Sequence, residues 1–372
     1  MRVNIKIEMQ TLEYLGCKKQ LVNWIHDAII KMMEMTGADT FHFVDACCGT
    51  GVIAHHMRQA GASSIHANDT EPYAAVIGHA VARSAATPKC LALIESINKS
   101  LDESLDESLD ESLDKTTTTT EVVGLIEREY SGARMFFTPE NARRIDTARR
   151  HIAKETSLTK DEHAFMIASL VISADAVSNT TAVYGAFLKS YKKASLKPFQ
   201  MVPIHNITKV AKKGRGTRHD ALDPSLYAEA TTTKGAHVVY VDPPYNARQY
   251  SKNYFPLNAI AWDPSRDDEF KINSDTVTGI PAECYLSPFC RKAQAAESFK
   301  RLVTAVPPSS HLLVSYSSEG IVSKEELESI LKERGGKLTI REQQHKRFAS
   351  ASYNDTSKKT TTEYLFCVSP PA

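Results

Sequence analysis

Short apolar runs that end in a polar residue alternate with stretches of helical periodicity along most of the chain. Four runs have the length and the β-branched content of buried strands, at residues 41–45, 63–69, 237–242 and 311–316. The first three end in an acid: Asp45, Asp69 and Asp242. Strands that alternate with helices favour a parallel α/β sheet. Two later apolar segments, 337–341 and 364–368, are expected to form an antiparallel pair at one edge of that sheet.

A mostly helical block is predicted between the two halves of the sheet. Thr138 precedes a proline and has the residue type that begins a helix, and residues 157–162 begin a second helix that is apolar on nearly all sides. We therefore divide the chain into a catalytic domain, formed by residues 1–84 and 200–372, and a helical insertion over residues 85–199.

A Ser-Leu-Asp-Glu repeat and a threonine tract occupy residues 99–121 of the insertion. One leucine in each unit offers little apolar surface against the entropy of ordering, so we expect a disordered surface loop. The repeat also distorts the charge balance, because residues 100–114 carry seven acids and no base. Without them, the formal net charge of +1 becomes +8. A basic remainder permits a polyanion such as nucleic acid as a partner.

Composition disfavours several classes of protein. No apolar run reaches the roughly 18 residues of a membrane span, and the first residues lack the pattern of a signal peptide. The seven cysteines include no Cys-x-x-Cys pair, which argues against a disulfide framework and a zinc ribbon. We expect no metal, no membrane association and an intracellular protein, cytoplasmic in a prokaryotic or viral-host setting.

A glycine-rich turn, Asp45-Ala-Cys-Cys-Gly-Thr-Gly51, follows the first predicted strand. Glycines let a backbone approach a ligand beside the N–H groups that open the next helix. Asp69 ends the second strand, where a carboxylate can accept hydrogen bonds from ribose hydroxyls. Gly49, Gly51 and Asp69 together indicate a cofactor that contains adenosine. They fit a dinucleotide as well as S-adenosylmethionine.

The motif Asp242-Pro-Pro-Tyr245 follows the third strand and indicates chemistry on an amino group. Pro243 and Pro244 stiffen the turn and have no N–H, which leaves carbonyl groups directed into the pocket. The Asp242 carboxylate and the Pro243 carbonyl can accept hydrogen bonds from an exocyclic amino group and so orient its lone pair. Tyr245 offers an aromatic face to a base that has left its stack. A nucleotide-dependent oxidoreductase would leave this motif unexplained.

In their order along most of the chain, these motifs resemble the D12 class of DNA adenine-N6 methyltransferases, of the restriction-modification type. Three further segments are similar to motifs of that class: Tyr14-Leu-Gly-Cys-Lys18, His219-Asp-Ala221 and Asn246-Ala-Arg-Gln-Tyr250. The resemblance implies a Rossmann-like methyltransferase sheet with an inserted helical target-recognition subdomain, and S-adenosylmethionine as cofactor. The cofactor-binding residues it implies are Tyr14, Lys18, Asp45, Gly49, Gly51, Asp69 and Asp220. Cys47 departs from the class, which usually has phenylalanine there, and this loosens the packing beneath the cofactor.

The resemblance also implies an activity and its partners. The activity is site-specific transfer of a methyl group to adenine N6 in double-stranded DNA, by base flipping and direct attack, with Asp242, Pro243, Pro244 and Tyr245 as catalytic residues. A restriction endonuclease for the same site is the implied protein partner. Two alternatives remain. One is an RNA adenine-N6 methyltransferase, which Asp rather than Asn at 242 disfavours, and the other is a catalytically silent DNA-binding module on the same fold.

Basic residues cluster in the insertion and before the third strand. Arg143, Arg144, Arg149 and Arg150 share one predicted helix, where they either contact phosphates or form a solvated face. Residues 212–218 are the best phosphate-binding candidate, because their two glycines would let the backbone run close to DNA. The expected DNA contacts are Lys212, Lys213, Arg215, Arg218, Asn246 and Arg248.

Overall fold

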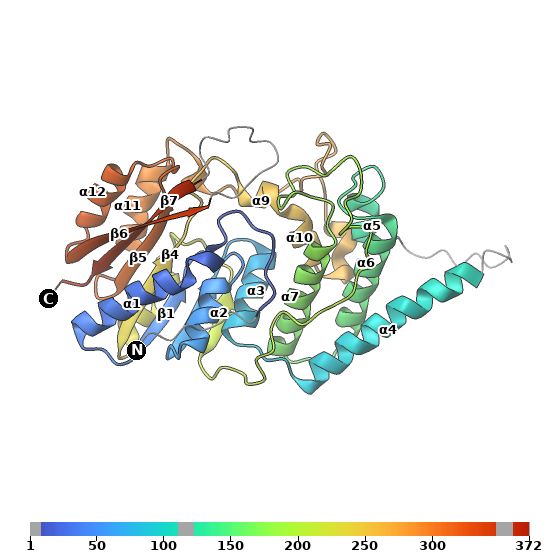
Figure 1. The fold of residues 1–372 in the computed structure, drawn as a ribbon, viewed down its shortest axis with the longest axis horizontal. Coiled ribbons are helices and arrows are strands. Elements are labelled where there is room, and N and C mark those ends of the chain that lie inside the picture. Colours follow the sequence, from blue (N-terminus) through green and yellow to red (C-terminus); the bar gives the residue numbers. More distant parts are fainter. Residues whose placement is uncertain (1–8, 111–122, 347–359, 372) are drawn as a thin grey trace.

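A seven-stranded sheet with helices on both faces forms the left part of the molecule in Figure 1, and a group of helices forms the right part. The computed structural model describes residues 9–110, 123–346 and 360–371. The strand order is β3-β2-β1-β4-β5-β7-β6, and all pairs are parallel except the two that β7 makes with β5 and β6. The strands are β1 (Phe41–Asp45), β2 (Ser64–Asn68), β3 (Gly214–Thr217), β4 (Ala236–Val241), β5 (His311–Ser317), β6 (Lys337–Lys346) and β7 (Thr360–Ser369). The predicted parallel α/β sheet and its antiparallel edge pair are confirmed.

Helices cover the two faces of the sheet with two separate apolar cores. On one face, Phe43 and Val238 pack with residues of α1 (Val22–Thr36), α2 (Val52–Gln59) and α3 (Pro72–Ala82). On the other, Val44 and Val239 pack with α11 (Ala295–Ala305) and α12 (Lys324–Lys332). Neighbouring residues of one strand point to opposite faces, and both faces are buried. This is why the strands are continuous apolar runs in the sequence.

Two helices of the right part, α6 and α7, begin where the sequence predicts them. Thr138 caps α6 by accepting a hydrogen bond from the Asn141 N–H at 3.1 Å, and Thr159 forms a capping box with Glu162 at the start of α7. This part contains α4 (Pro88–Asp110), α5 (Leu125–Tyr130), α6 (Pro139–Lys154), α7 (Lys160–Ala176) and α10 (Phe255–Ile260). Shorter helices are α8 (Glu229–Thr232) and α9 (Tyr250–Asn253), with 3₁₀ turns at Lys18–Gln20, Pro224–Tyr227, Pro264–Glu269 and Pro288–Cys290. In the described part of the chain, no helix has the length and apolar content needed to cross a membrane.

The Ser-Leu-Asp-Glu repeat begins inside α4, so the expected loop over residues 99–121 is wrong as far as Asp110. Arg144 of α6 donates to the Leu101 carbonyl at 2.8 Å and to the Asp102 carboxylate at 2.7 Å, and Leu101 is buried. The first unit thus meets a partner surface that the sequence alone did not reveal. Residues 111–121 lie outside the described residues. Figure 1 shows α4 leading away from the rest of the molecule.

Strand β3 is not among the strands predicted from the sequence, and its glycines explain how it is accommodated. A Cβ on Gly214 would lie 2.2 Å from the Ala82 carbonyl oxygen, and a Cβ on Gly216 would lie 2.3 Å from the His79 backbone nitrogen. The two glycines therefore let β3 pack directly against α3, beside β2. Their role in the fold is close helix–strand packing.

Candidate active site

The carboxyl ends of β1, β2 and β4 meet at one edge of the sheet, and a pocket opens there, as is usual in α/β folds. Nearly every motif predicted from the sequence contributes to its lining. These residues are Tyr14, Lys18, Asp45, Gly49, Asp69, Asp220, Asp242, Pro243, Pro244 and Tyr245. Gly51 is not among the lining residues, because it packs against Val81 of α3.

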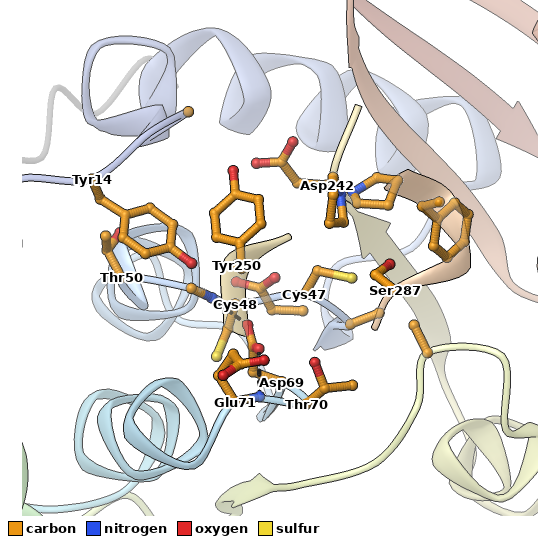
Figure 2. A pocket seen from close by; sticks show the side chains of 18 of the residues that line it. Tyr14, Cys47, Cys48, Thr50, Asp69, Thr70, Glu71, Asp242, Tyr250 and Ser287 are labelled. Carbon is orange, nitrogen blue, oxygen red and sulfur yellow. Dashed lines mark hydrogen bonds between the residues drawn. The ribbon is translucent and has the colours of Figure 1, made fainter. Parts of the chain in front are cut away.

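The glycine-rich turn is fixed to the acid that ends β2. The Gly49 N–H donates to Asp69 Oδ2 at 2.8 Å, and the Glu71 N–H donates to Asp69 Oδ1 at 3.0 Å (Figure 2). Gly49 and Gly51 have φ angles of +48° and +71°, which glycine adopts without strain. Burial raises the pKa of the Asp69 carboxyl, and these N–H groups partly offset that rise. Asp69 therefore orders the turn in addition to facing the pocket.

The lining is strongly acidic. Five acids and one base contribute to it: Asp45, Asp69, Glu71, Asp220, Asp242 and Lys18. Asp45 is buried, and its Oδ1 has no hydrogen-bond partner among the described residues. Burial, followed by the nearby Asp242 and Asp69 charges, raises the pKa of Asp45 well above its ordinary value. Burial also raises the pKa of Glu71, to about 7. Such a lining favours a ligand with positive charge.

Aromatic rings form another part of the wall. The Tyr14 ring stacks on Tyr254 with centroids 4.4 Å apart and lies 5.3 Å from the Tyr250 ring. Figure 2 shows Tyr14 and Tyr250 close to each other on the Asp242 side of the pocket, with Asp69 and Glu71 on the opposite side. Tyr250 was not predicted as a site residue, although it ends the motif at residues 246–250. Tyr285, which also was not predicted, donates to Asp220 Oδ2 at 3.0 Å.

Lys18 contacts the Asp242-Pro-Pro-Tyr245 motif directly. Its Nζ lies 2.8 Å from Asp242 Oδ1 and 3.3 Å from Oε1 of Glu363, a buried residue of β7. Burial lowers the pKa of Lys18, but the two carboxylates outweigh it, so the pKa lies well above its ordinary value. Burial raises the pKa of Asp242 to about 6 against the opposing effect of Lys18. Glu363 was not predicted from the sequence, because it belongs to no recognisable motif.

The predicted DNA contacts lie at two different edges of the sheet. Arg218 donates to the Thr70 carbonyl at 2.9 Å, beside the pocket, and Asn246 and Arg248 follow the catalytic motif there. Arg215 binds Glu229 and lies 3.1 Å from the His66 ring. The structure does not bring Lys212 and Lys213 to the pocket, because they precede β3 and so lie at the amino ends of the parallel strands.

The arginine cluster on α6 has a mainly structural role. Arg144 and Arg149 have exposed fractions of only 4% and 1%. Arg149 donates to Asp146 at 2.8 Å and to Asp267 at 2.7 Å. The phosphate-binding interpretation is therefore wrong for these two arginines, because a buried and paired guanidinium cannot reach DNA. Arg143 is exposed.

A parallel sheet with one reversed strand, and a pocket that joins its strand ends to an Asp-Pro-Pro-Tyr motif, define a Rossmann-like α/β methyltransferase. Residues 14–330 match the D12 class N6 adenine-specific DNA methyltransferases, and the chain belongs to this family. It is an adenine-specific DNA methyltransferase of the restriction-modification kind and requires a methyl donor. No group of three or more His, Cys, Asp or Glu residues in the described part of the chain is arranged to hold a metal ion.

Two relatives match nearly the whole chain. The Type II methyltransferase M.CviAII of Paramecium bursaria Chlorella virus 1 is 35% identical over 370 residues, which cover 97% of this chain and 99% of the relative. The Type II methyltransferase M.NlaIII of Neisseria lactamica is 30% identical over 364 residues, which cover 95% and 98%. Among solved structures, the rRNA methyltransferase aviRa from Streptomyces viridochromogenes covers 93% of this chain and 84% of its own, at 12% identity and a TM-score of 0.30. That structural likeness is weak, and the family assignment rests on the sequence match.

Proposed function

We propose that the protein transfers a methyl group from S-adenosylmethionine to N6 of an adenine that is flipped out of double-stranded DNA. The observation that carries this proposal is the position of Asp242 and Tyr245, at the end of β4 and inside an acidic pocket. The rest of the lining supports this methyl donor.

The pocket residues fit S-adenosylmethionine in charge and in shape. The molecule carries a net positive charge, and the lining has five acids, one of which has a buried oxygen without a hydrogen-bond partner among the described residues. The Tyr14 ring offers a flat apolar surface, and the Asp69 and Glu71 carboxylates suit ribose hydroxyls. The residues that would hold the cofactor are Tyr14, Asp45, Gly49, Asp69, Glu71 and Asp220. When bound, it supplies an electrophilic methyl group on a positively charged sulfur.

The catalytic motif would hold the target base by position alone. The Asp242 carboxylate and the Pro243 carbonyl accept the two N–H groups of the amino nitrogen and aim its lone pair into the pocket. Lys18 engages Oδ1 of Asp242, and no contact among the described residues engages the other oxygen. Tyr245 packs edge to face on Tyr316, at 6.3 Å between ring centroids, and so presents a fixed surface to the flipped adenine. No covalent intermediate is needed.

We further propose that the helical part over residues 85–199 recognises the target sequence and that Arg218, Asn246 and Arg248 contact the DNA beside the pocket. The two named relatives support a restriction-modification role, in which an endonuclease acts at the same site. The target sequence can be found by expression in a methylation-free host, followed by sequencing that detects N6-methyladenine. Methylation of RNA in place of duplex DNA by the purified protein would contradict the proposed substrate.

Asp242→Ala tests the reaction. This variant is expected to lose methyl transfer by more than about a hundredfold, because the amino group is no longer oriented. Cofactor binding should fall much less, since the acids around Asp69 remain. Labelled S-adenosylmethionine with duplex DNA measures the rate, and calorimetry measures cofactor binding. Asp268→Ala, at an exposed acid far from the motif, is the control. Full activity of Asp242→Ala would contradict the proposed mechanism.

A further inference from the structure

Glu363 of β7 contacts Lys18, which lines the pocket, although it lies far along the chain from every motif that the sequence identifies. We propose that Glu363 is a positioning residue for methyl transfer, which holds the Lys18 ammonium against Asp242 and thereby fixes the position and the charge of the catalytic carboxylate. This inference rests on the proposed transfer of a methyl group to adenine, and the contacts that support it lie within the protein.

The Lys18 ammonium is fully used by the protein. An ammonium has three N–H donors. Its Nζ lies 2.8 Å from Asp242 Oδ1, 3.3 Å from Glu363 Oε1 and 3.2 Å from the Gly16 carbonyl oxygen. These three acceptors take up all three donors and leave none for a carboxylate of the cofactor. The resemblance assigned Lys18 to the cofactor, whereas the contacts assign it to the catalytic motif.

Glu363 is itself held in place. It is only 2% exposed, and the Ser315 hydroxyl of β5 donates to its Oε1 at 2.6 Å. A buried carboxylate is costly to the fold unless it is paired. Glu363 is paired with Lys18, which also contacts Asp242. An apolar residue at this position would serve stability as well, so the pairing with Lys18 points to a role in the reaction.

The charge of Asp242 depends on this arrangement. The titratable groups that face Asp242 from its surroundings are Lys18, Asp45, Cys47, Tyr240, Tyr245, Tyr250 and Glu363. Lys18 is the only cation in this set. Without it, burial and the two acids would raise the pKa of Asp242 further, and a protonated carboxyl would lose an acceptor for the target amino group. Anchoring Lys18 therefore keeps Asp242 ready to bind the base.

Two substitutions separate the two effects of Glu363, which holds Lys18 in place and also puts a negative charge near Asp242. Glu363→Gln keeps an oxygen that accepts from Lys18 and Ser315 but removes one negative charge near Asp242. It should keep most of the activity at neutral pH and lower the pKa of Asp242 by roughly one pH unit. Glu363→Leu removes the anchor and should slow single-turnover methylation by roughly ten- to a hundredfold, with DNA and cofactor affinities unchanged. Carbon NMR of labelled aspartate, assigned with Asp242→Asn, follows the Asp242 titration without any turnover.

The outcomes are distinct. An Asp242 pKa that does not move in Glu363→Gln overturns the inference, even in a fully active enzyme. A wild-type rate of single-turnover methylation in Glu363→Leu also overturns the inference. If Glu363→Leu fails to fold, the Glu363→Gln titration still decides. A wild-type protein that methylates no adenine overturns the proposed function instead, and the NMR titration then tests the electrostatic contact by itself.

Discussion

Asp242 can accept hydrogen bonds with both oxygens only while it is ionised, and its surroundings determine the pH at which this is so. Burial raises its pKa to about 6, with Lys18 opposing that rise and Glu363 adding to it. A carboxyl with a raised pKa is charged above that value and becomes protonated as the pH falls through it.

Single-turnover methylation is therefore expected to be constant above neutrality and to fall about tenfold for each pH unit below about 6. The measurement is a pH–rate profile at saturating cofactor. Saturation matters because burial raises the pKa of Glu71, at the other side of the pocket, to about 7, and Glu71 is one of the residues proposed to hold the cofactor. Circular dichroism over the same range controls for unfolding. A rate that stays constant down to pH 5 would rule out Asp242 as the titrating group.

Single residues differ in how far the sequence could identify them. Asp242 and Tyr245 could be predicted because a strand followed by Asp-Pro-Pro-Tyr is a local pattern with a chemical meaning. Glu363 could not, because it is one acid in a strand near the other end of the chain. Only the pairing of β7 with β5 brings it to Lys18. Contacts of this kind depend on the folded sheet, and no short-range signal marks them.

Secondary-structure elements followed the sequence where their signals were local. The bounds of β1 match the predicted apolar run, and Thr138 begins α6 as expected. The two differences have a common cause. β3 is a strand because α3 accommodates two glycines beside it, and α4 continues into the repeat because Arg144 binds its first unit. In both cases a neighbouring element, which the local sequence does not show, decides the conformation.

Helix α6 offers a direct comparison of a buried and an exposed arginine. Arg149→Met is expected to lower the free energy of unfolding by about 3–5 kcal/mol, because Asp146 loses its partner in the interior. Arg143→Met, on the exposed side of the same helix, should cost less than about 1 kcal/mol. Urea unfolding measures both. If Arg149→Met kept its stability but bound DNA weakly, the arginine would serve the DNA and not the fold.

The whole molecule carries its charge unevenly, since seven acids of the repeat oppose a remainder of +8. Replacing Asp and Glu by Asn and Gln at five positions should raise DNA affinity at low salt and leave the methylation rate unchanged. These positions are Asp106, Glu107, Asp110, Glu111 and Asp114. Asp102 is kept because it pairs with Arg144. The gain in DNA affinity should shrink at higher salt, because the electrostatic screening length falls from roughly 30 Å at 0.01 M to about 8 Å at 0.15 M.

Fluorescence anisotropy with one duplex at both salt concentrations measures this difference. The matched control replaces the serines of the same units, Ser104, Ser108 and Ser112, by alanine, which leaves the charge as it is. Equal affinity of the neutralised and the wild-type protein at low salt would show that the repeat does not repel DNA.

The direction of α4 has a consequence for how the gene can change. Each Ser-Leu-Asp-Glu unit corresponds to four codons, so an error in replication that adds or removes one unit keeps the reading frame. One added unit lengthens a helix by about 6 Å. Because α4 leads away from the sheet (Figure 1), the added length is not expected to change the spacing of Lys18, Asp242 and Glu363. The repeat is a place where the coding sequence can grow or shrink between generations while the encoded enzyme keeps its catalytic geometry.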